Sequence, residues 1–208
     1  MKKKKIKGLY AITPDGLSTE LLLEKVREVI AGGARIIQYR NKSDDIAHRL
    51  WQADALAALA KAQDAVFIIN DSIDLAWSTN ADGVHLGKDD SDVAAARRRL
   101  PYKLIGVSCY GDLERAIEAE KLGADYVAFG SAFSSSTKPN ASPVPLELYQ
   151  EAVRRLSIPI VAIGGIKIDN AKQVIDTGVD AIAVISGLFE ADNIRARAEC
   201  FSQLFEIG

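Results

Sequence analysis

Eight short apolar runs, spaced along nearly the whole chain, constrain the fold of this sequence more than any other feature. The runs consist largely of Val, Ile, Leu and Ala, without the polar alternation of a half-exposed strand. Strands that are buried on both faces have this composition, and such strands form parallel sheets. We therefore predict strands at residues 8–13, 35–39, 66–70, 83–86, 104–108, 126–130, 160–163 and 181–185.

Amphipathic segments of helical length separate these runs. Leu22, Val26 and Val29 fall on one face of the first such segment, and Gly178 follows a later one where a C-cap favours a left-handed residue. Eight strands that are each followed by a helix predict an α/β fold, a closed (β/α)8 TIM barrel. A doubly wound open sheet is the alternative, because short elements such as residues 73–78 could be miscounted.

Composition limits the domain organisation and the partners. The 208 residues, 48% of them hydrophobic, suffice for one sizeable core, and no composition shift divides them, so we predict a single barrel domain over residues 1–208. The 26 basic and 28 acidic residues leave a net charge of −2, which argues against nucleic acid as a partner. No apolar stretch is long enough for a membrane span, and the two cysteines form no disulfide framework, so we expect a cytoplasmic protein without a membrane partner.

Polar residues at the end of the second run are candidate ligands for phosphate. In a barrel, binding and catalytic side chains stand at the ends of the strands and in the loops that follow them. Gln38, Arg40 and Lys42 alternate there, so strand geometry points their side chains to one side. Two cations and an amide suit a polyphosphate, whereas an ordinary pair of surface cations is the alternative.

Carboxylates follow the third and fourth runs. Asp71 comes after the third run, and Asp89 and Asp90 come after the fourth. Neighbouring loops can bring such groups onto one Mg²⁺ together with substrate phosphates. The alternatives are that Asp71 caps the short helix that begins near Ser72, and that Asp89, Asp90 and Asp92 merely charge a helix start.

Three side chains of reactive type also stand near strand ends. His85 lies inside the fourth run, and we expect a buried, hydrogen-bonded core histidine rather than a catalytic base. Ser108 has no histidine near it in the sequence, so a hydrogen-bonding role is expected in place of a hydrolase nucleophile. Cys109 has no evident activator and is assigned no role.

Hydroxyls and glycines follow the last three runs. Residues 131–140 form a long hydroxyl-rich loop that contains Lys138, which we interpret as a lid over phosphates or as a flexible serine-rich loop. Gly164 and Gly165 follow the seventh run, and Ser186 follows the eighth. Glycine lets backbone N–H groups approach an anion, and these two loops form the recurrent phosphate site of barrels; two tight turns are the alternative.

The order of these motifs is specific, although each motif by itself is common. Over residues 9–188 the chain resembles the thiamin phosphate synthase family. The motifs that carry the resemblance are Tyr10-Ala11-Ile12-Thr13, Gln38-x-Arg40-x-Lys42, Asn70-Asp71, Gly83-Val84-His85-Leu86-Gly87 with Asp90, Gly106-Val107-Ser108, Thr137-Lys138, Ile163-Gly164-Gly165-Ile166 and Val184-Ile185-Ser186.

The resemblance implies a transferase that joins hydroxymethylpyrimidine diphosphate to a thiazole phosphate and releases pyrophosphate, with Mg²⁺ as cofactor. It also implies a dissociative substitution, in which the pyrimidine becomes a stabilised carbocation before the thiazole nitrogen attacks. By motif, Asp71 and Asp90 bind the metal, Arg40, Lys42, Asn70 and Lys138 hold the diphosphate, Gln38 and Ser108 contact the pyrimidine or its diphosphate, Ser135 and Thr137 meet the thiazole, and Gly165, Ile185 and Ser186 bind its phosphate through backbone N–H groups. Tyr39, Asn41 and Ser136 complete the predicted binding set, and Arg40, Lys42, Ser108 and Lys138 are the predicted catalytic residues.

Two other functions compete with this one. A thiazole tautomerase-like isomerase would rely on a histidine after the fifth strand, where this chain has Ser108, Cys109 and Tyr110. A non-catalytic protein that binds a phosphate ligand would have no use for the metal carboxylates. A homo-oligomer is compatible with the sequence, which does not define the oligomeric state.

Overall fold

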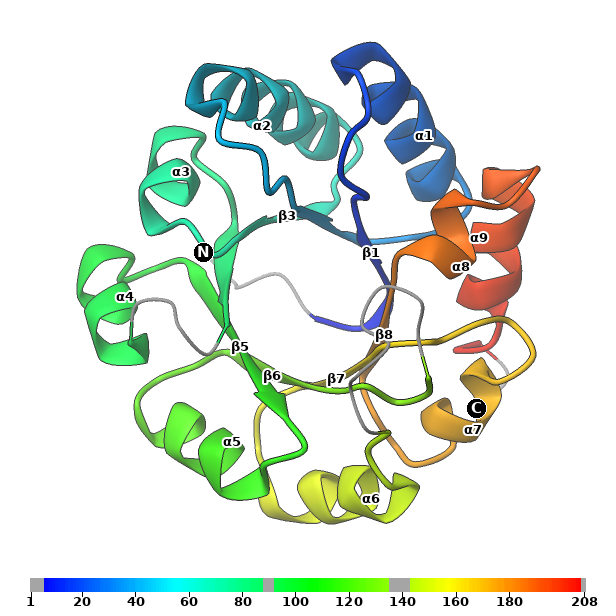
Figure 1. Ribbon diagram of the computed structural model, residues 1–208. Coiled ribbons are helices and arrows are strands. Elements are labelled where there is room, and N and C mark those ends of the chain that lie inside the picture. The colour runs from blue at the N-terminus through cyan, green and yellow to red at the C-terminus, as the bar shows by residue number, and fades with distance from the viewer. Residues whose placement is uncertain (1–5, 88–91, 135–142, 207–208) are drawn as a thin grey trace.

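Eight parallel strands close into a barrel, each paired with the next and β8 paired with β1 (Figure 1). The computed structural model describes residues 6–87, 92–134 and 143–206. All eight predicted strands are present, and closure of the barrel excludes the open doubly wound sheet. The strands are β1 (Gly8–Ile12), β2 (Ile36–Tyr39), β3 (Val66–Asn70), β4 (Gly83–Leu86), β5 (Leu104–Tyr110), β6 (Tyr126–Phe129), β7 (Ile160–Ile163) and β8 (Ala181–Val184).

Helices surround the barrel in the order that the sequence predicts, with two helices after β8 instead of one (Figure 1). The last helix, α9, packs beside α1 and so covers the seam where β1 meets β8. The helices are α1 (Thr19–Ala31), α2 (Ile46–Ala62), α3 (Ile73–Ser78), α4 (Val93–Arg99), α5 (Leu113–Lys121), α6 (Leu146–Arg155), α7 (Ala171–Ile175), α8 (Ser186–Phe189) and α9 (Ile194–Gln203). Among the described helices, none combines the length and the apolar composition that a membrane span requires.

Short polar side chains cap several of these helices and decide the alternatives above for Asp71 and Asp92. Ser72 caps α3, because its hydroxyl accepts the Leu75 N–H at 3.2 Å. Asp71 is therefore not the cap, and its carboxylate is available for another role. Asp92, by contrast, is the N-cap of α4 and accepts the Ala95 N–H at 2.7 Å, as expected for a carboxylate at a helix start.

The strands separate two apolar cores. Residues of one parity fill the barrel interior, and residues of the other parity pack against the helices, because side chains alternate along a strand. The interior core consists of Ile6, Tyr10, Ile12, Ile36, Val66, Ile68, Leu104, Tyr126, Ala128, Val161, Ala181 and Ala183. Gln38 shares the interior face with Ile36, whereas Tyr39 belongs to the core between strands and helices.

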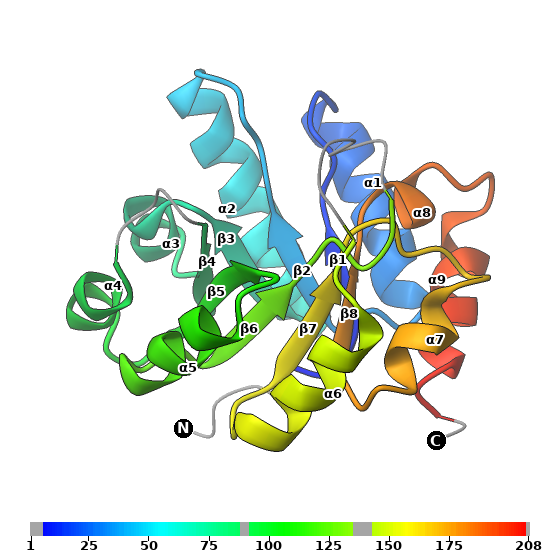
Figure 2. The same cartoon turned by 60° about the horizontal axis from the view of Figure 1, so that its bottom comes forward.

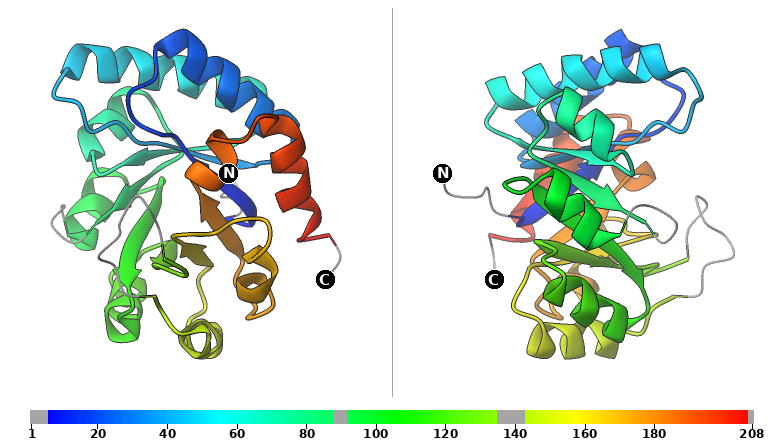
Figure 3. Two further views of the ribbon diagram at one scale, coloured as in Figure 1. Left: turned by 45° about the vertical axis from the view of Figure 1, so that its right-hand side comes forward. Right: turned by 90° about the vertical axis from the view of Figure 1, so that its left-hand side faces the viewer.

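All eight strands point the same way, so their C-terminal ends meet at one end of the barrel (Figure 2). The side views show the helices running back beside the strands toward the opposite end (Figure 3). Residues that follow the strands are consequently gathered at one mouth, although they are far apart in the sequence.

Candidate active site

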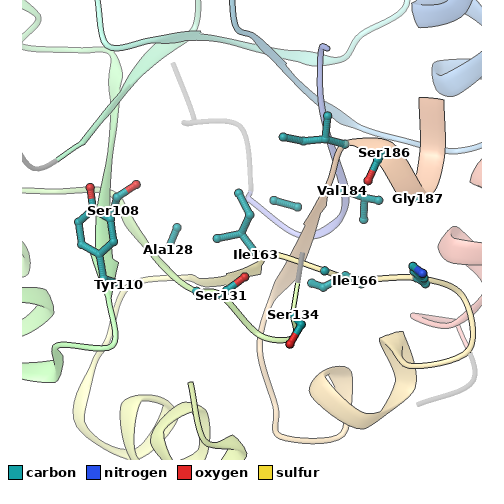
Figure 4. Close-up of a pocket in the computed structure, with 16 residues that line it drawn as sticks. Ser108, Tyr110, Ala128, Ser131, Ser134, Ile163, Ile166, Val184, Ser186 and Gly187 are labelled. Carbon is teal, nitrogen blue, oxygen red and sulfur yellow. The ribbon is translucent and has the colours of Figure 1, made fainter. Parts of the chain in front are cut away.

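A cavity of about 390 Å³ opens at the barrel mouth over the ends of β5 to β8. Ser108 and Tyr110 stand on one wall, and Ser186 and Gly187 stand on the opposite wall (Figure 4). We call this space the serine–glycine cavity. Its lining residues are Ser108, Tyr110, Ala128, Gly130, Ser131, Ser134, Ile163, Gly164, Gly165, Ile166, Lys167, Ala183, Val184, Ile185, Ser186 and Gly187. The predicted phosphate-binding residues Gly165, Ile185 and Ser186 are thus brought together.

The glycine pair after β7 is required for close packing at this mouth. Gly165 has φ +63°, and a Cβ there would lie 2.4 Å from the backbone oxygen of Ser134. Gly164 has φ +101°, and its Cβ would lie 2.1 Å from Ser131 Oγ. The tight-turn interpretation therefore explains why glycine is needed. The same close approach leaves the backbone of the β7 loop bare on the cavity wall, as a phosphate site requires.

Lys167 is a cavity-lining cation that the sequence analysis missed. The Asn170 side chain clamps its loop, since Oδ1 accepts the Lys167 N–H at 2.7 Å and Nδ2 donates to the Gly165 oxygen at 3.0 Å. The position of Lys167 in the sequence could have indicated this role. The lysine lies two residues after the glycine pair at the end of β7, in the loop that commonly binds phosphate in barrels.

Four charged residues form a network above the ends of β1 to β3, which we call the charged rim: Asp15, Arg40, Lys42 and Asp71. Arg40 Nη1 donates to Asp15 Oδ2, and Asp15 Oδ1 accepts the Lys42 backbone N–H at 3.0 Å. Lys42 Nζ donates to Asp71 Oδ2 at 2.5 Å. Exposed ion pairs of this kind contribute only about 0–1 kcal/mol each, so both cations can exchange a carboxylate for a substrate phosphate at small cost.

The backbone on both sides of the charged rim is fixed. Thr13, fully buried, accepts the Arg40 N–H at 2.9 Å and donates its hydroxyl to the Arg40 oxygen at 3.1 Å. Asp71 adopts φ +64°, and its N–H donates to the His85 oxygen at 2.8 Å. A non-glycine residue in this left-handed conformation costs about 1 kcal/mol, and such residues concentrate at functional sites. Asn70, at the end of β3, precedes it on the interior-facing parity.

Two predicted binding residues point elsewhere. The Tyr39 side chain is buried toward α2, where its hydroxyl donates to Gln52 Oε1 at 2.9 Å. Asn41 donates to the same Gln52 oxygen at 3.0 Å and accepts the Ser43 N–H at 2.8 Å, so its amide orders the loop. Neither side chain joins the charged rim or lines the serine–glycine cavity, because the parity of β2 directs Tyr39 outward.

His85 is a buried, hydrogen-bonded core residue, as the sequence predicts. Its Nε2 lies 2.9 Å from Ser108 Oγ, and its Nδ1 lies 3.1 Å from Tyr126 Oη. The prediction that Ser108 has no histidine near it is wrong in three dimensions, because β4 and β5 are neighbouring strands and bring His85 and Ser108 together. Burial lowers the pKa of the imidazole to about 4, and the charge of Asp71 opposes this shift.

The contact continues across the barrel interior through two tyrosines. Tyr126 Oη lies 2.9 Å from Tyr10 Oη, and Tyr10 Oη accepts from Gln38 Nε2 at 2.7 Å. We call Gln38, Tyr10, Tyr126, His85 and Ser108 the interior relay. It joins the two residues predicted to contact the pyrimidine. Both tyrosines are buried, which raises the pKa of each phenol and keeps each hydroxyl protonated.

Cys109 stays outside the site. Its side chain is buried in the core between strands and helices, and burial raises the pKa of its thiol to about 12. A thiol in this state is not a nucleophile at neutral pH.

Five predicted site residues, namely Asp90, Ser135, Ser136, Thr137 and Lys138, lie outside the described residues. Within the described part of the chain, no three His, Cys, Asp or Glu side chains cluster as metal ligands. Asp71 is therefore the one predicted metal ligand whose surroundings are known.

The fold and the mouth define a (β/α)8 barrel with a cavity and a set of charged side chains at the C-terminal ends of its strands, where barrels place their binding sites. Comparison with known proteins gives the family. A family model described as thiamine monophosphate synthase matches residues 9–188. The thiamine-phosphate synthase of Chromobacterium violaceum is 50% identical over 202 residues, which cover 97% of this chain and 97% of that protein. The thiamine-phosphate synthase of Aromatoleum aromaticum is 47% identical over 203 residues, which cover 97% of this chain and 98% of that protein.

A solved structure agrees. The thiamine phosphate pyrophosphorylase from Pyrococcus furiosus superposes with a TM-score of 0.87 at 40% identity, over 96% of each chain. The chain belongs to the thiamine monophosphate synthase family, as its motifs predict. This family is enzymatic, and the relatives are named thiamine-phosphate synthases, an activity of the transferase class.

Proposed function

We propose that this chain is a thiamine-phosphate synthase, which joins hydroxymethylpyrimidine diphosphate to thiazole phosphate and releases pyrophosphate. The carrying observation is that the barrel mouth has two unlike parts, the charged rim over β1 to β3 and the serine–glycine cavity over β5 to β8. Two such parts suit two anionic substrates held side by side. Relatives with this activity in their names, matched along nearly the whole chain, support the same assignment.

The serine–glycine cavity is the proposed site of the thiazole phosphate. Backbone N–H groups of Gly165, Ile185 and Ser186 would hold the phosphate, and Lys167 would add a positive charge. A cavity of about 390 Å³ is within the size range of sites for small ligands. The predicted thiazole contacts Ser135 and Thr137 follow β6 in the sequence, and the end of that strand borders this cavity.

The charged rim is the proposed site of the diphosphate. Arg40 offers a planar guanidinium for bidentate contact with phosphate oxygens, and Lys42 offers a compact charge beside it. Asn70 and Lys138 complete the proposed set. Gln38 and Ser108, at the two ends of the interior relay, would meet the pyrimidine end of the same substrate.

Asp71 fits a Mg²⁺ ligand. Its carboxylate is 28% exposed, its backbone is anchored to β4, and its present partner Lys42 would turn to the incoming diphosphate. Mg²⁺ commonly binds through one or two carboxylates plus substrate phosphates, so a site without a protein cluster is adequate. Asp90 is the proposed second carboxylate. When bound, the ion supplies positive charge beside the leaving diphosphate.

The proposed reaction is dissociative and relies on fixed charge and position. As the bond to the diphosphate lengthens, Arg40 and Lys42 meet the negative charge that develops on the departing oxygens. The serine–glycine cavity holds the thiazole nitrogen against the pyrimidine carbon, which replaces a bimolecular encounter. No strong base is needed on this route. The buried, neutral His85 and the inert Cys109 agree with that requirement.

The test is product formation by the purified protein from both substrates with Mg²⁺, followed as thiamin phosphate fluorescence after oxidation. Asp71→Ala should reduce kcat/KM by at least about a hundredfold, because it removes a metal ligand at the reacting centre. Asp54→Ala, on the exposed face of α2, is the matched control and should behave as the unsubstituted protein. Absence of product, or equal rates for Asp71→Ala and Asp54→Ala, would refute the proposal.

A cytoplasmic location fits the same proposal. Both cysteines are free, and the thiol of Cys200 is exposed, which suits a reducing compartment. A homo-oligomer remains compatible with the chain and is measurable by light scattering.

A further inference from the structure

The interior relay carries an inference about how Ser108 is presented to substrate. Four of its five members are buried inside the barrel, and Ser108 alone borders the serine–glycine cavity. Its members come from β1, β2, β4, β5 and β6, so the closed barrel is needed to assemble it. A buried polar group that lacks a hydrogen-bond partner costs free energy. The relay is therefore expected to adopt the one arrangement of hydrogens in which every hydrogen bond is made.

Counting hydrogens gives the relay a direction. Gln38 Nε2 donates to Tyr10 Oη at 2.7 Å, so the Tyr10 hydroxyl must place its own hydrogen elsewhere. Among the described residues, Tyr126 Oη, at 2.9 Å, is the acceptor within reach. Tyr126, having accepted from Tyr10, then donates to His85 Nδ1 at 3.1 Å.

The tautomer of His85 determines which atom donates in its hydrogen bond with Ser108. A neutral imidazole whose Nδ1 accepts a hydrogen bond carries its single hydrogen on Nε2. That nitrogen lies 2.9 Å from Ser108 Oγ, so the serine oxygen accepts and its own hydrogen is left for a group in the cavity.

We propose that the interior relay runs in one direction, from Gln38 to Ser108, and presents the Ser108 hydroxyl as a hydrogen-bond donor to an acceptor atom of the pyrimidine diphosphate. Tyr10, Tyr126 and His85 are then positioning residues, which act on the substrate through Ser108. The identity of the acceptor rests on the proposed function; the direction of the relay does not.

The opposite direction would have a different chemical meaning. If the hydrogen of His85 stood on Nδ1, Nε2 would accept the Ser108 hydroxyl hydrogen, and the pair would resemble the base and nucleophile of a hydrolase. The hydrogen count argues against this arrangement: Tyr126 would then accept from His85, and one of the two tyrosine hydroxyls would have no acceptor within the barrel interior that the structure describes.

The tautomer of His85 tests the direction without any substrate. The chain has two histidines, so ¹⁵N spectra of histidine-labelled protein are assigned by comparison with His48→Gln. We expect hydrogen on Nε2 of His85 in the unsubstituted protein and a loss of that preference in Tyr126→Phe. Hydrogen on Nδ1 in the unsubstituted protein would overturn the proposal.

A double-mutant cycle on kcat/KM for the pyrimidine diphosphate tests the effect on substrate. Tyr126→Phe keeps the ring and removes the link, and we expect about a tenfold loss, similar to that of Ser108→Ala. Because both act through one hydroxyl, the double variant should also lose about tenfold. A loss of about a hundredfold would show two independent effects and overturn the proposal.

Tyr149→Phe is the matched control for this cycle. Tyr149 is an equally buried tyrosine whose hydroxyl donates to the Phe129 oxygen at 3.2 Å, outside the interior relay. Its kcat/KM should stay within about twofold. Should Tyr126→Phe fail to fold, Tyr10→Phe removes the hydroxyl that donates to Tyr126, so Tyr126 can either donate to His85 or accept from it, and a weaker preference for hydrogen on Nε2 of His85 is expected. If the unsubstituted protein forms no thiamin phosphate, the proposed function fails, while the histidine tautomer still decides the direction.

Discussion

Acidification should destabilise this protein by an amount that His85 sets. Burial lowers the pKa of its imidazole from 6.5 to about 4 in the folded chain. As the pH falls below 6.5, the unfolded chain binds a proton at this residue, whereas the folded chain does not until about pH 4. The stability from the neutral ring is therefore fully present above pH 6.5 and is lost progressively toward pH 4.

The size of the effect follows from the width of this window. One proton changes the free energy of unfolding by about 1.4 kcal/mol for each pH unit. Across the interval from 6.5 to about 4 the loss therefore reaches roughly 3 kcal/mol. Since a domain is held by only about 5–15 kcal/mol, this single side chain controls a substantial fraction of the stability.

Urea unfolding at a series of pH values measures the loss of stability that His85 causes. Carboxylates also titrate in this range, so the informative quantity is the difference between the unsubstituted protein and His85→Gln, which has no imidazole at this position. That difference should shrink by roughly 3 kcal/mol from neutral pH to about pH 4. His48→Gln, on the partly exposed α2, is the control and should preserve the steep loss. Parallel curves for the unsubstituted protein and His85→Gln would refute the argument.

Three further predictions concern the barrel mouth. Gly165→Ala should lower the free energy of unfolding by about 2 kcal/mol in urea unfolding, because φ is +63° and the new Cβ would lie 2.4 Å from a backbone oxygen. The control is Gly111→Ala, because a Cβ at position 111 would meet its nearest atom at 3.5 Å. Asp15→Asn should lower KM for the pyrimidine diphosphate by up to about fivefold in steady-state kinetics, since it removes the carboxylate that Arg40 must leave to bind phosphate; a raised KM would contradict this. Tyr39→Phe should cost about 1 kcal/mol of stability through its lost hydrogen bond and leave kcat/KM unchanged, and a kinetic defect would place its hydroxyl on the substrate.

The barrel was predictable because strands that are buried on both faces have an almost wholly apolar composition, which is visible in the sequence. Nearly continuous apolar runs such as Val66–Asn70 are typical of strands that are covered on both faces, and the number of these runs indicates the architecture. The ends were less predictable. The sequence predicts a strand to residue 185, whereas β8 stops at Val184 and Ile185 is the N-cap of α8, because composition alone does not fix the last residue of a strand.

The site was predictable where charge and strand end coincide. Arg40 and Asp71 follow strands directly, Lys42 continues the alternation of Gln38 and Arg40, and barrel geometry gathers the three residues. Asp15 was missed because it lies three residues after β1 ends, in a turn where an aspartate has many ordinary roles. The contact between His85 and Ser108 was missed because it joins residues 23 apart on neighbouring strands, and the register pairs His85 with Gly106, two residues before Ser108.

The interior relay also has a requirement of volume. Tyr126 crosses the barrel directly over Gly106, where a Cβ would lie 2.0 Å from the tyrosine ring. A side chain larger than glycine at position 106 is therefore compatible only with a smaller residue at position 126. In relatives with alanine or serine in place of Gly106, we expect a smaller residue in place of Tyr126 and, with it, a different way of orienting Ser108.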